Sequence, residues 1–265
     1  MNDTQNTDTG EQTLQSIFEE MVEPCYVVRS STAILESIVQ AADDDTPTLH
    51  ILASVEDLRT VRQQFRLATN LAELCNQDRF TLTPVAPAGR GTVLVGDERA
   101  YAVAYIDGEQ LLFEAVSYPE TLIETCSRYR GTETFDLRTP AWEEVSKTLT
   151  ETFNTDVADD FRLAIQEWTE TVDEQAIDEV DIALLIACTH KLLLYDLSTW
   201  GEDLGVASKA TFSRAKTALA DAGVLATEKV PIEVGRPRLR LTLTDEYASL
   251  SFIDLLDAAN DSVAP

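Results

Sequence analysis

Basic and hydroxyl-bearing side chains concentrate in one stretch of an otherwise acidic chain. Residues 204–241 hold seven Lys and Arg against three Asp and Glu, whereas the 265 residues together carry a formal net charge of −27. Clustered cations suit the phosphates of DNA, and hydroxyls donate to phosphates or base edges. Surface pairing with acids elsewhere is the alternative, but such pairs contribute little and do not require clustering. The candidate DNA-binding residues are Lys209, Thr211, Ser213, Arg214, Lys216, Thr217, Arg236, Arg238 and Arg240.

Two helices joined by a tight turn are expected to position the first six of these side chains. The apolar run 177–196 predicts one long helix, and Ser198 is expected to cap a short helix that ends at Leu204. Ser208 is expected to cap a longer helix that runs to Ala222. The spacing of its apolar residues predicts one buried stripe, so its basic and hydroxyl residues lie on the opposite face.

A hairpin is expected to follow at once. Residues 226–232 and 238–244 read as strands, and Gly-Arg-Pro-Arg at 235–238 lies at the turn between them. At this tip, Arg236 and Arg238 would reach phosphates or the minor groove of DNA. An apolar helix at 245–259 closes the chain, and its surplus apolar surface suggests a homodimer on paired half-sites.

This order of elements resembles the winged helix-turn-helix of transcription regulators. The segments that carry the resemblance are GVASKATFSRAKTALADAGVL, similar to a recognition helix, and GRPRLRLTLTDEY, similar to a wing. The resemblance implies that the binding partner is double-stranded DNA in promoter regions.

The earlier part of the chain predicts an α/β domain. Strands are expected at 25–29, 48–54 and 79–87, with helices at 31–42 and 55–76 between them, as in parallel βα units. An antiparallel meander follows at 91–97, 100–107 and 109–117, and helices resume at 119–130 and 140–154. The expected division is a disordered tail at 1–9, an α/β sensor or dimerisation domain at 10–154, an acidic linker helix at 155–175 and the winged helix-turn-helix at 176–260.

Motifs for catalysis or metal binding are missing from the sequence. It contains no G-x-S-x-G, P-loop or G-x-G-x-x-G. The four cysteines are widely spaced and only two histidines are present, which argues against a zinc site. No cofactor or metal is therefore expected, and the chain is interpreted as a protein other than an enzyme. A small-metabolite effector would bind at the carboxyl ends of the parallel strands, where the candidates are Arg29, Ser30, Ser54 and Thr83.

The composition predicts a cytoplasmic protein from a high-salt organism. Acids outnumber bases 47 to 20, and at 1 M salt a Debye length of about 3 Å screens their repulsion. No apolar run approaches the roughly 20 residues that span a bilayer, and the first residues lack a signal-peptide pattern.

Over its whole length, the sequence resembles the haloarchaeal TbsP family of transcription regulators. The resemblance rests on VEPCYVVRSS, LVGDERAYAVAYIDGEQLLFE and the segments quoted above. It implies a DNA-binding regulator of metabolic genes, including sugar metabolism. The first domain is also similar to the phospholipase-D-like effector domain of TrmB-type regulators, but Ile51 and Leu52 follow His50 where catalytic members have His-x-Lys. The alternative is a protein–protein adaptor that uses its winged helix as an interaction surface.

Overall fold

The computed structural model of the chain describes residues 14–28, 30–86, 91–106, 109–115, 119–167, 176–233 and 235–263. The chain divides into two compact units, unit 1 at Met1–Leu137 and unit 2 at Arg138–Pro265. The tail expected at 1–9 lies outside the described residues. In the described part of the chain, no helix has the length and apolar character needed to cross a membrane.

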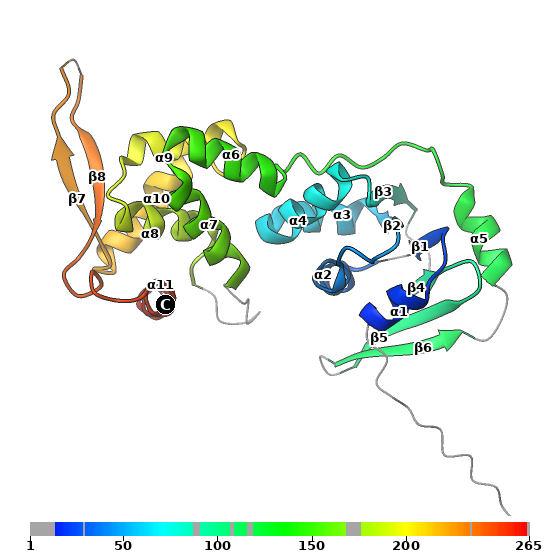
Figure 1. Cartoon of the computed structure of the whole chain (residues 1–265). Helices are drawn as coiled ribbons and strands as arrows, with labels where there is room; N and C mark the ends of the chain where they lie inside the picture. Colours follow the sequence, from blue (N-terminus) through cyan, green and yellow to red (C-terminus); the bar gives the residue numbers. More distant parts are fainter. Residues whose placement is uncertain are drawn as a thin grey trace, which may run out of the picture. The chain divides into compact units, whose positions relative to one another are not determined.

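Unit 1 is an α/β domain around one mixed sheet (Figure 1). Its helices are α1 (Leu14–Glu20), α2 (Thr32–Ala41), α3 (Val55–Gln63), α4 (Phe65–Asn76) and α5 (Pro119–Ser127). Its strands are β1 (Cys25–Val28), β2 (Leu49–Ser54), β3 (Phe80–Val85), β4 (Thr92–Val95), β5 (Ala100–Ile106) and β6 (Glu109–Ala115). The six strands lie in the order β3-β2-β1-β4-β5-β6. Strands β1 to β3 pair in parallel and the remaining pairs are antiparallel, which confirms the expected βα units and meander.

The two faces of the sheet have different covers. Alternate residues of β1 and β2, such as Val27 and Ile51, are fully buried on the face that packs against α3 and α4. On the other face, Tyr26, Leu52 and Val95 form a buried cluster with Cys126 of α5. Figure 1 shows α5 on the opposite side of the sheet from α3 and α4.

The helix expected at 55–76 is two helices. Gln64, between α3 and α4, has φ −100° and ψ 97°, an extended conformation that interrupts the helix. Apolar spacing continues on both sides of this residue, so the periodicity alone did not reveal the break.

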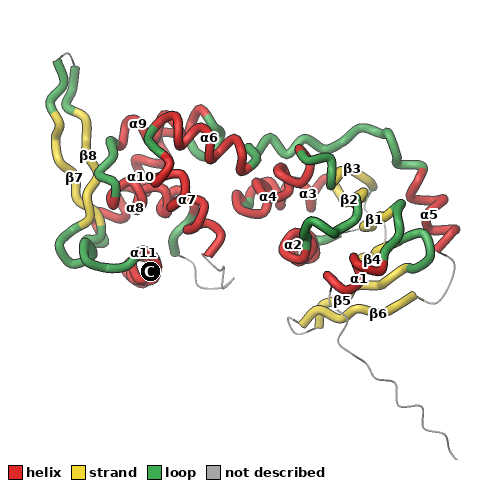
Figure 2. Tube along the Cα trace, viewed as in Figure 1, coloured by secondary structure: helices red, strands yellow, loops and turns green. Residues whose placement is uncertain are grey.

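In its described residues, unit 2 is helical apart from one antiparallel hairpin, which follows directly after α10 in Figure 2. Its elements are α6 (Trp142–Thr152), α7 (Thr155–Glu167), α8 (Glu179–Thr189), α9 (Leu194–Asp203), α10 (Lys209–Asp221), β7 (Leu225–Val230), β8 (Arg238–Leu243) and α11 (Phe252–Val263).

The boundary between the units lies earlier than the expected division at 154. Trp142 of α6 and Trp200 of α9 both pack on Phe161 of α7. The ring centroid of Phe161 lies 6.3 Å from that of Trp142 and 5.7 Å from that of Trp200. The Trp200 Nε1 also donates to the Thr148 hydroxyl at 3.1 Å. These contacts make α6 part of the second unit.

The helix expected to link the domains, at 155–175, is not a linker where it is described. Phe161 is 1% exposed within α7, and its neighbours on the same face are also buried. Asp160 of α7 lies 2.6 Å from a ring nitrogen of His190 at the end of α8. Asp156 and Asp159 are exposed on the outer face of α7, and its inner face belongs to the core of unit 2.

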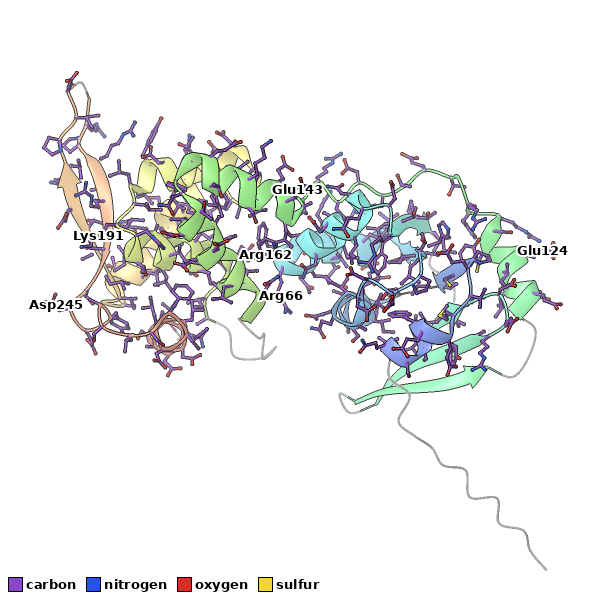
Figure 3. The ribbon with its side chains drawn as sticks, in the orientation of Figure 1. Arg66, Glu124, Glu143, Arg162, Lys191 and Asp245 are labelled. Atoms are coloured by element: carbon purple, nitrogen blue, oxygen red, sulfur yellow. The ribbon has the colours of Figure 1, made fainter. Side chains whose placement is uncertain are left out.

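The long helix expected at 177–196 ends at Thr189. His190 closes α8, Lys191 has φ +54° and Leu193 then takes the N-cap position of α9. Ser198 is therefore inside α9 and is not a cap, since its hydroxyl donates to the Tyr195 carbonyl. Lys191 marks this turn, next to β8, in Figure 3.

The closing helix also starts later than residue 245. Residues 245–250 form turns, and the Ser251 hydroxyl accepts from the Asp254 N–H at the start of α11. The capping serine therefore fixes where the helix starts, whereas the apolar spacing upstream of Ser251 predicted a start that was too early.

Candidate nucleic-acid interface

Helix α10 begins where its sequence predicts. Ser208 is extended, with φ −70° and ψ 154°, and its hydroxyl accepts from the Thr211 N–H at 3.2 Å. Phe212 and Leu219 are fully buried on the inner face. Gly201 of α9 faces the Phe212 ring so closely that a Cβ at this glycine would lie 2.3 Å from a ring carbon. Glycine thus lets α9 and α10 pack closely, with one face of α10 turned outward.

The outward face carries most of the predicted α10 residues. Lys209, Ser213, Arg214 and Thr217 are exposed, whereas Thr211 and Lys216 are half-buried. Two hydroxyls are already engaged within the helix. Thr211 accepts from Arg214 at 3.4 Å, and Thr217 donates to the Ser213 carbonyl at 2.9 Å. Ser213 and Arg214 are exposed, and the Arg214 guanidinium keeps further N–H donors for a ligand besides the one directed at Thr211.

Strand β8 and the turn that precedes it carry the remaining predicted bases. Arg240 lies opposite Glu228 in the register, and Arg238 lies opposite Val230. Arg236 is exposed at the tip, next to Gly235 with φ +119°. The base of the hairpin joins the α8–α9 turn, because the Leu241 N–H donates to the Leu192 carbonyl at 2.9 Å.

Three of the predicted bases have acidic neighbours. Lys209 pairs with Glu202 at 3.2 Å, and Arg240 lies 3.9 Å from Glu228. Arg238 pairs with Asp196 at 2.9 Å. All six side chains are partly exposed, so each pair contributes little and a phosphate could replace the carboxylate. Within the described ranges, the bases without an ion pair in this stretch are Arg214, Lys216, Lys229 and Arg236.

Tyr195 of α9 connects the two basic surfaces and was missed by the sequence reasoning. The Arg238 guanidinium carbon lies 4.1 Å from its ring centroid, and the Lys209 ammonium lies 5.7 Å from it. The ring is 51% exposed. An aromatic face attracts cations, so Tyr195 holds the hairpin arginine beside the start of α10. Its sequence position inside an apolar run hid this role, because the run reads as core.

Among the described residues of unit 1, the predicted ligand-binding residues Ser30, Ser54 and Thr83 have different local roles. Arg29 lies outside the described residues. Ser54 caps α3 by accepting from the Asp57 N–H at 3.1 Å, and the buried Ser30 hydroxyl donates to the Ser31 carbonyl. Thr83 lines a pocket of unit 1.

The four cysteines are free thiols. Burial raises the pKa of Cys25 and Cys188 to about 12 and that of Cys75 and Cys126 to about 11. These thiols therefore stay protonated at neutral pH and are poor nucleophiles. Among the residues that the structure describes, no cluster of three His, Cys, Asp or Glu could hold a metal ion.

Comparisons with known proteins agree with the two units. Residues 3–140 match the family model for the N-terminal domain of TbsP-like transcriptional regulators, and residues 141–260 match the model for their C-terminal helix-turn-helix domain. No curated protein and no solved structure matches the chain. The division between the two matches lies close to the structural boundary after Leu137. The chain belongs to the TbsP-like transcriptional regulators, a family with a helix-turn-helix at its C-terminal end.

Proposed function

We propose that the protein is a sequence-specific transcription regulator whose unit 2 binds promoter DNA as a winged helix-turn-helix. In this proposal α10 enters the major groove and the β7–β8 hairpin is the wing. The observation that carries it is the exposed face of α10, which presents Arg214 and Ser213 to solvent, followed by a hairpin with Arg236 at its tip. Seven bases in this stretch stand out from a chain with a net charge of −27.

The geometry supports different roles for individual side chains. Arg214 and Ser213 are the best placed to read base edges, and Lys209, Thr211, Lys216 and Thr217 would contact the phosphates that flank the groove. Arg236 would enter the minor groove or bind a phosphate at the wing tip. Arg238 and Arg240 would exchange their carboxylate partners for phosphates, which the partial exposure of these pairs allows.

The wider proposal is a cytoplasmic, haloarchaeal regulator of metabolic genes, including sugar metabolism, that acts as a homodimer without catalysis. The excess of acids over bases supports a high-salt cytoplasm. Leu250 and Ile253, next to and within α11, are 39% and 42% exposed, which supports a dimer contact. Unit 1 would act as the sensor or dimerisation domain.

Selection of bound duplexes from a random DNA library tests this function. The full chain should enrich one sequence motif, and fluorescence anisotropy then measures its affinity at several salt concentrations. Arg214→Gln should weaken binding to the motif by about 1–3 kcal/mol and relax its specificity. Arg236→Gln should weaken binding to the motif and to unrelated DNA by similar factors. It should also reduce by about 1 the slope of the logarithm of the binding constant against the logarithm of the salt concentration.

Lys147→Gln provides the matched control, because Lys147 is an exposed base of unit 2 on α6, outside the helix-turn-helix and the hairpin. Its affinity for DNA should equal that of the wild type. Absence of any enriched motif would contradict the proposal and favour an adaptor whose arginines bind another protein.

A further inference from the structure

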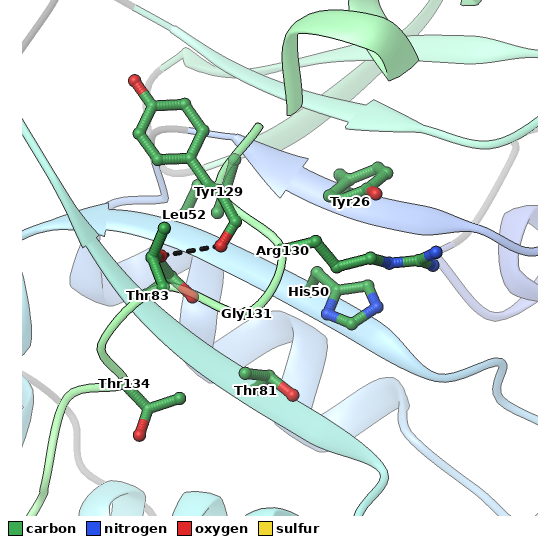
Figure 4. A pocket seen from close by; sticks show the side chains of 10 residues that line it. Tyr26, His50, Leu52, Thr81, Thr83, Tyr129, Arg130, Gly131 and Thr134 are labelled. Carbon is green, nitrogen blue, oxygen red and sulfur yellow. Dashed lines mark hydrogen bonds between the residues drawn. The ribbon is translucent and has the colours of Figure 1, made fainter. Parts of the chain in front are cut away.

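Unit 1 contains a pocket that DNA binding does not use. It has a volume of about 190 Å³ and lies between the β1–β3 face of the sheet and the chain segment 129–134. Paired strand positions supply its floor, because Tyr26 pairs with His50 and His50 with Thr81 in the parallel register. Figure 4 shows these side chains together with Thr83 and Arg130.

The Tyr26 hydroxyl is an unpartnered polar group in this pocket. Its side chain is 1% exposed, and the hydroxyl has no hydrogen-bond partner in the described part of the chain. A buried hydroxyl without a partner is costly, so a structure normally satisfies it. Because Tyr26 lines the pocket, a ligand that reaches this hydroxyl would supply the missing acceptor.

Arg130 supplies a cation at the same place. In Figure 4 its side chain extends toward the rings of Tyr26 and His50. Within the described ranges, the guanidinium makes neither an ion pair nor a hydrogen bond, whereas its neighbour Arg128 lies 3.7 Å from Glu124. Arg130 is exposed at the pocket mouth, where it can meet an incoming anion.

His50 adds an imidazole ring, which in its neutral form can donate one hydrogen bond and accept another. Its ring centroid lies 5.3 Å from that of Tyr26. Burial, and then the charge of Arg130, lower the pKa of His50 from 6.5, while the Glu23 carboxylate acts in the opposite direction. At neutral pH the imidazole is therefore uncharged, and Arg130 is the cation that lines the pocket.

We propose that this pocket binds a compact metabolite through one oxyanion group, a carboxylate or a phosphate, which pairs with Arg130 and accepts a hydrogen bond from Tyr26. The Thr81 and Thr83 side chains would contact the hydroxyls of the same molecule. Engineered cavities of about 150 Å³ hold benzene, so this pocket suits about six to ten non-hydrogen atoms. The site would give unit 1 the ligand that its proposed sensor role requires. Its role in regulation rests on the proposed function, whereas ligand binding itself does not.

Calorimetric titration of the full chain without DNA tests the site at constant KCl. The probes share a three-carbon skeleton: glycerate carries a carboxylate, glycerol 3-phosphate carries a phosphate and glycerol carries no charge. One or both anions should bind and glycerol should not, and the better anion identifies the ligand class. Because no DNA is present, the result is separate from that of the DNA-binding test.

Two substitutions in the pocket locate the binding. Arg130→Gln should weaken the anion at least about tenfold and Tyr26→Phe several-fold, as expected for charge-assisted and neutral hydrogen bonds. Tyr26→Phe removes a hydroxyl that has no partner, so the protein should unfold at the same temperature or higher. Arg128→Gln is the matched control, since this exposed arginine lies two residues away and does not line the pocket, and it should leave the affinity unchanged.

Two results would overturn the proposal. One is the failure of both anions to bind at concentrations up to about 10 mM, where even weak sites begin to fill. The other is binding that persists unchanged in Arg130→Gln and Tyr26→Phe, which would place the anion elsewhere on the chain.

Discussion

Asp181 is a buried carboxyl in the first turn of α8, where it forms a capping box with Asp178. Its side chain accepts from the Asp178 N–H at 3.1 Å, and Asp178 in turn accepts from the Asp181 N–H. Asp181 is 8% exposed. Burial, with a smaller contribution from the charge of Asp178, raises its pKa to about 6. The cap thus holds a charge at neutral pH that its surroundings disfavour.

Asp181→Asn should stabilise the protein at neutral pH, by on the order of 1–2 kcal/mol at pH 7. The amide keeps an acceptor for the Asp178 N–H and removes the buried charge. The raised pKa means that the folded wild type binds a proton more readily than the unfolded chain. Its stability relative to the variant therefore rises as the pH falls through about 6, and the difference should vanish near pH 4. Denaturant unfolding at several pH values measures this difference.

Asp178→Asn is the control for that prediction. Asparagine also caps helices well, so the change in unfolding free energy should stay within about 0.5 kcal/mol. An equal gain in both variants would show that the benefit comes from reducing the overall negative charge.

At the scale of elements, the contact between α9 and α10 depends on the absence of a side chain at residue 201. Glycine inside a helix usually costs about 1 kcal/mol relative to alanine, so its replacement would ordinarily stabilise the protein. Here the Phe212 ring occupies the space that a Cβ needs. Phe212 is fully buried, so moving its ring would disturb the core around it.

Gly201→Ala should therefore destabilise unit 2, by about 1–3 kcal/mol in the free energy of unfolding. It should also weaken DNA binding, because the outward face of α10 shifts. Chemical denaturation measures the first effect and anisotropy the second. Phe212→Leu makes room for the new methyl group, so the double variant should lose less stability than the two single variants together. Stabilisation by Gly201→Ala alone would contradict this packing.

At the scale of the whole molecule, unit 2 has a core that extends well beyond its helix-turn-helix. Helices α6 and α7 contribute Trp142 and Phe161, and the Phe161 ring contacts both Trp142 and Trp200. Val145, Leu149 and Val157 are also buried there. A fragment without these helices would expose Trp200 and leave its indole N–H without the Thr148 partner.

Two fragments test this boundary. Residues 138–265 should unfold cooperatively and bind the selected DNA motif, whereas residues 176–265 should lack a cooperative transition. The reason is that the shorter fragment loses the apolar side chains of α6 and α7 against which α8 and α9 pack. Circular dichroism during thermal unfolding separates the two cases. Cooperative unfolding of the shorter fragment would instead restore the boundary expected from the sequence.

Local sequence patterns were sufficient to predict much of the fold. Alternating strands and helices predicted the α/β unit, Ser208 predicted the start of α10, and the apolar stripe through Phe212 and Leu219 predicted its buried face. Charge counting selected the segment that the family comparison assigns to a helix-turn-helix domain. Each of these signals lies within about twenty residues of chain, where capping and helical periodicity act.

Long-range packing decided the rest. The place of Tyr195 between Arg238 and Lys209, the membership of α6 and α7 in unit 2, and the pocket of Tyr26, His50 and Arg130 join residues far apart in sequence. Tyr195 and Tyr26 read as ordinary core residues in their own segments. Composition and periodicity describe which face of an element is buried, but they do not specify which other element covers it. That choice follows from packing across the whole chain, and it set the partners of these side chains.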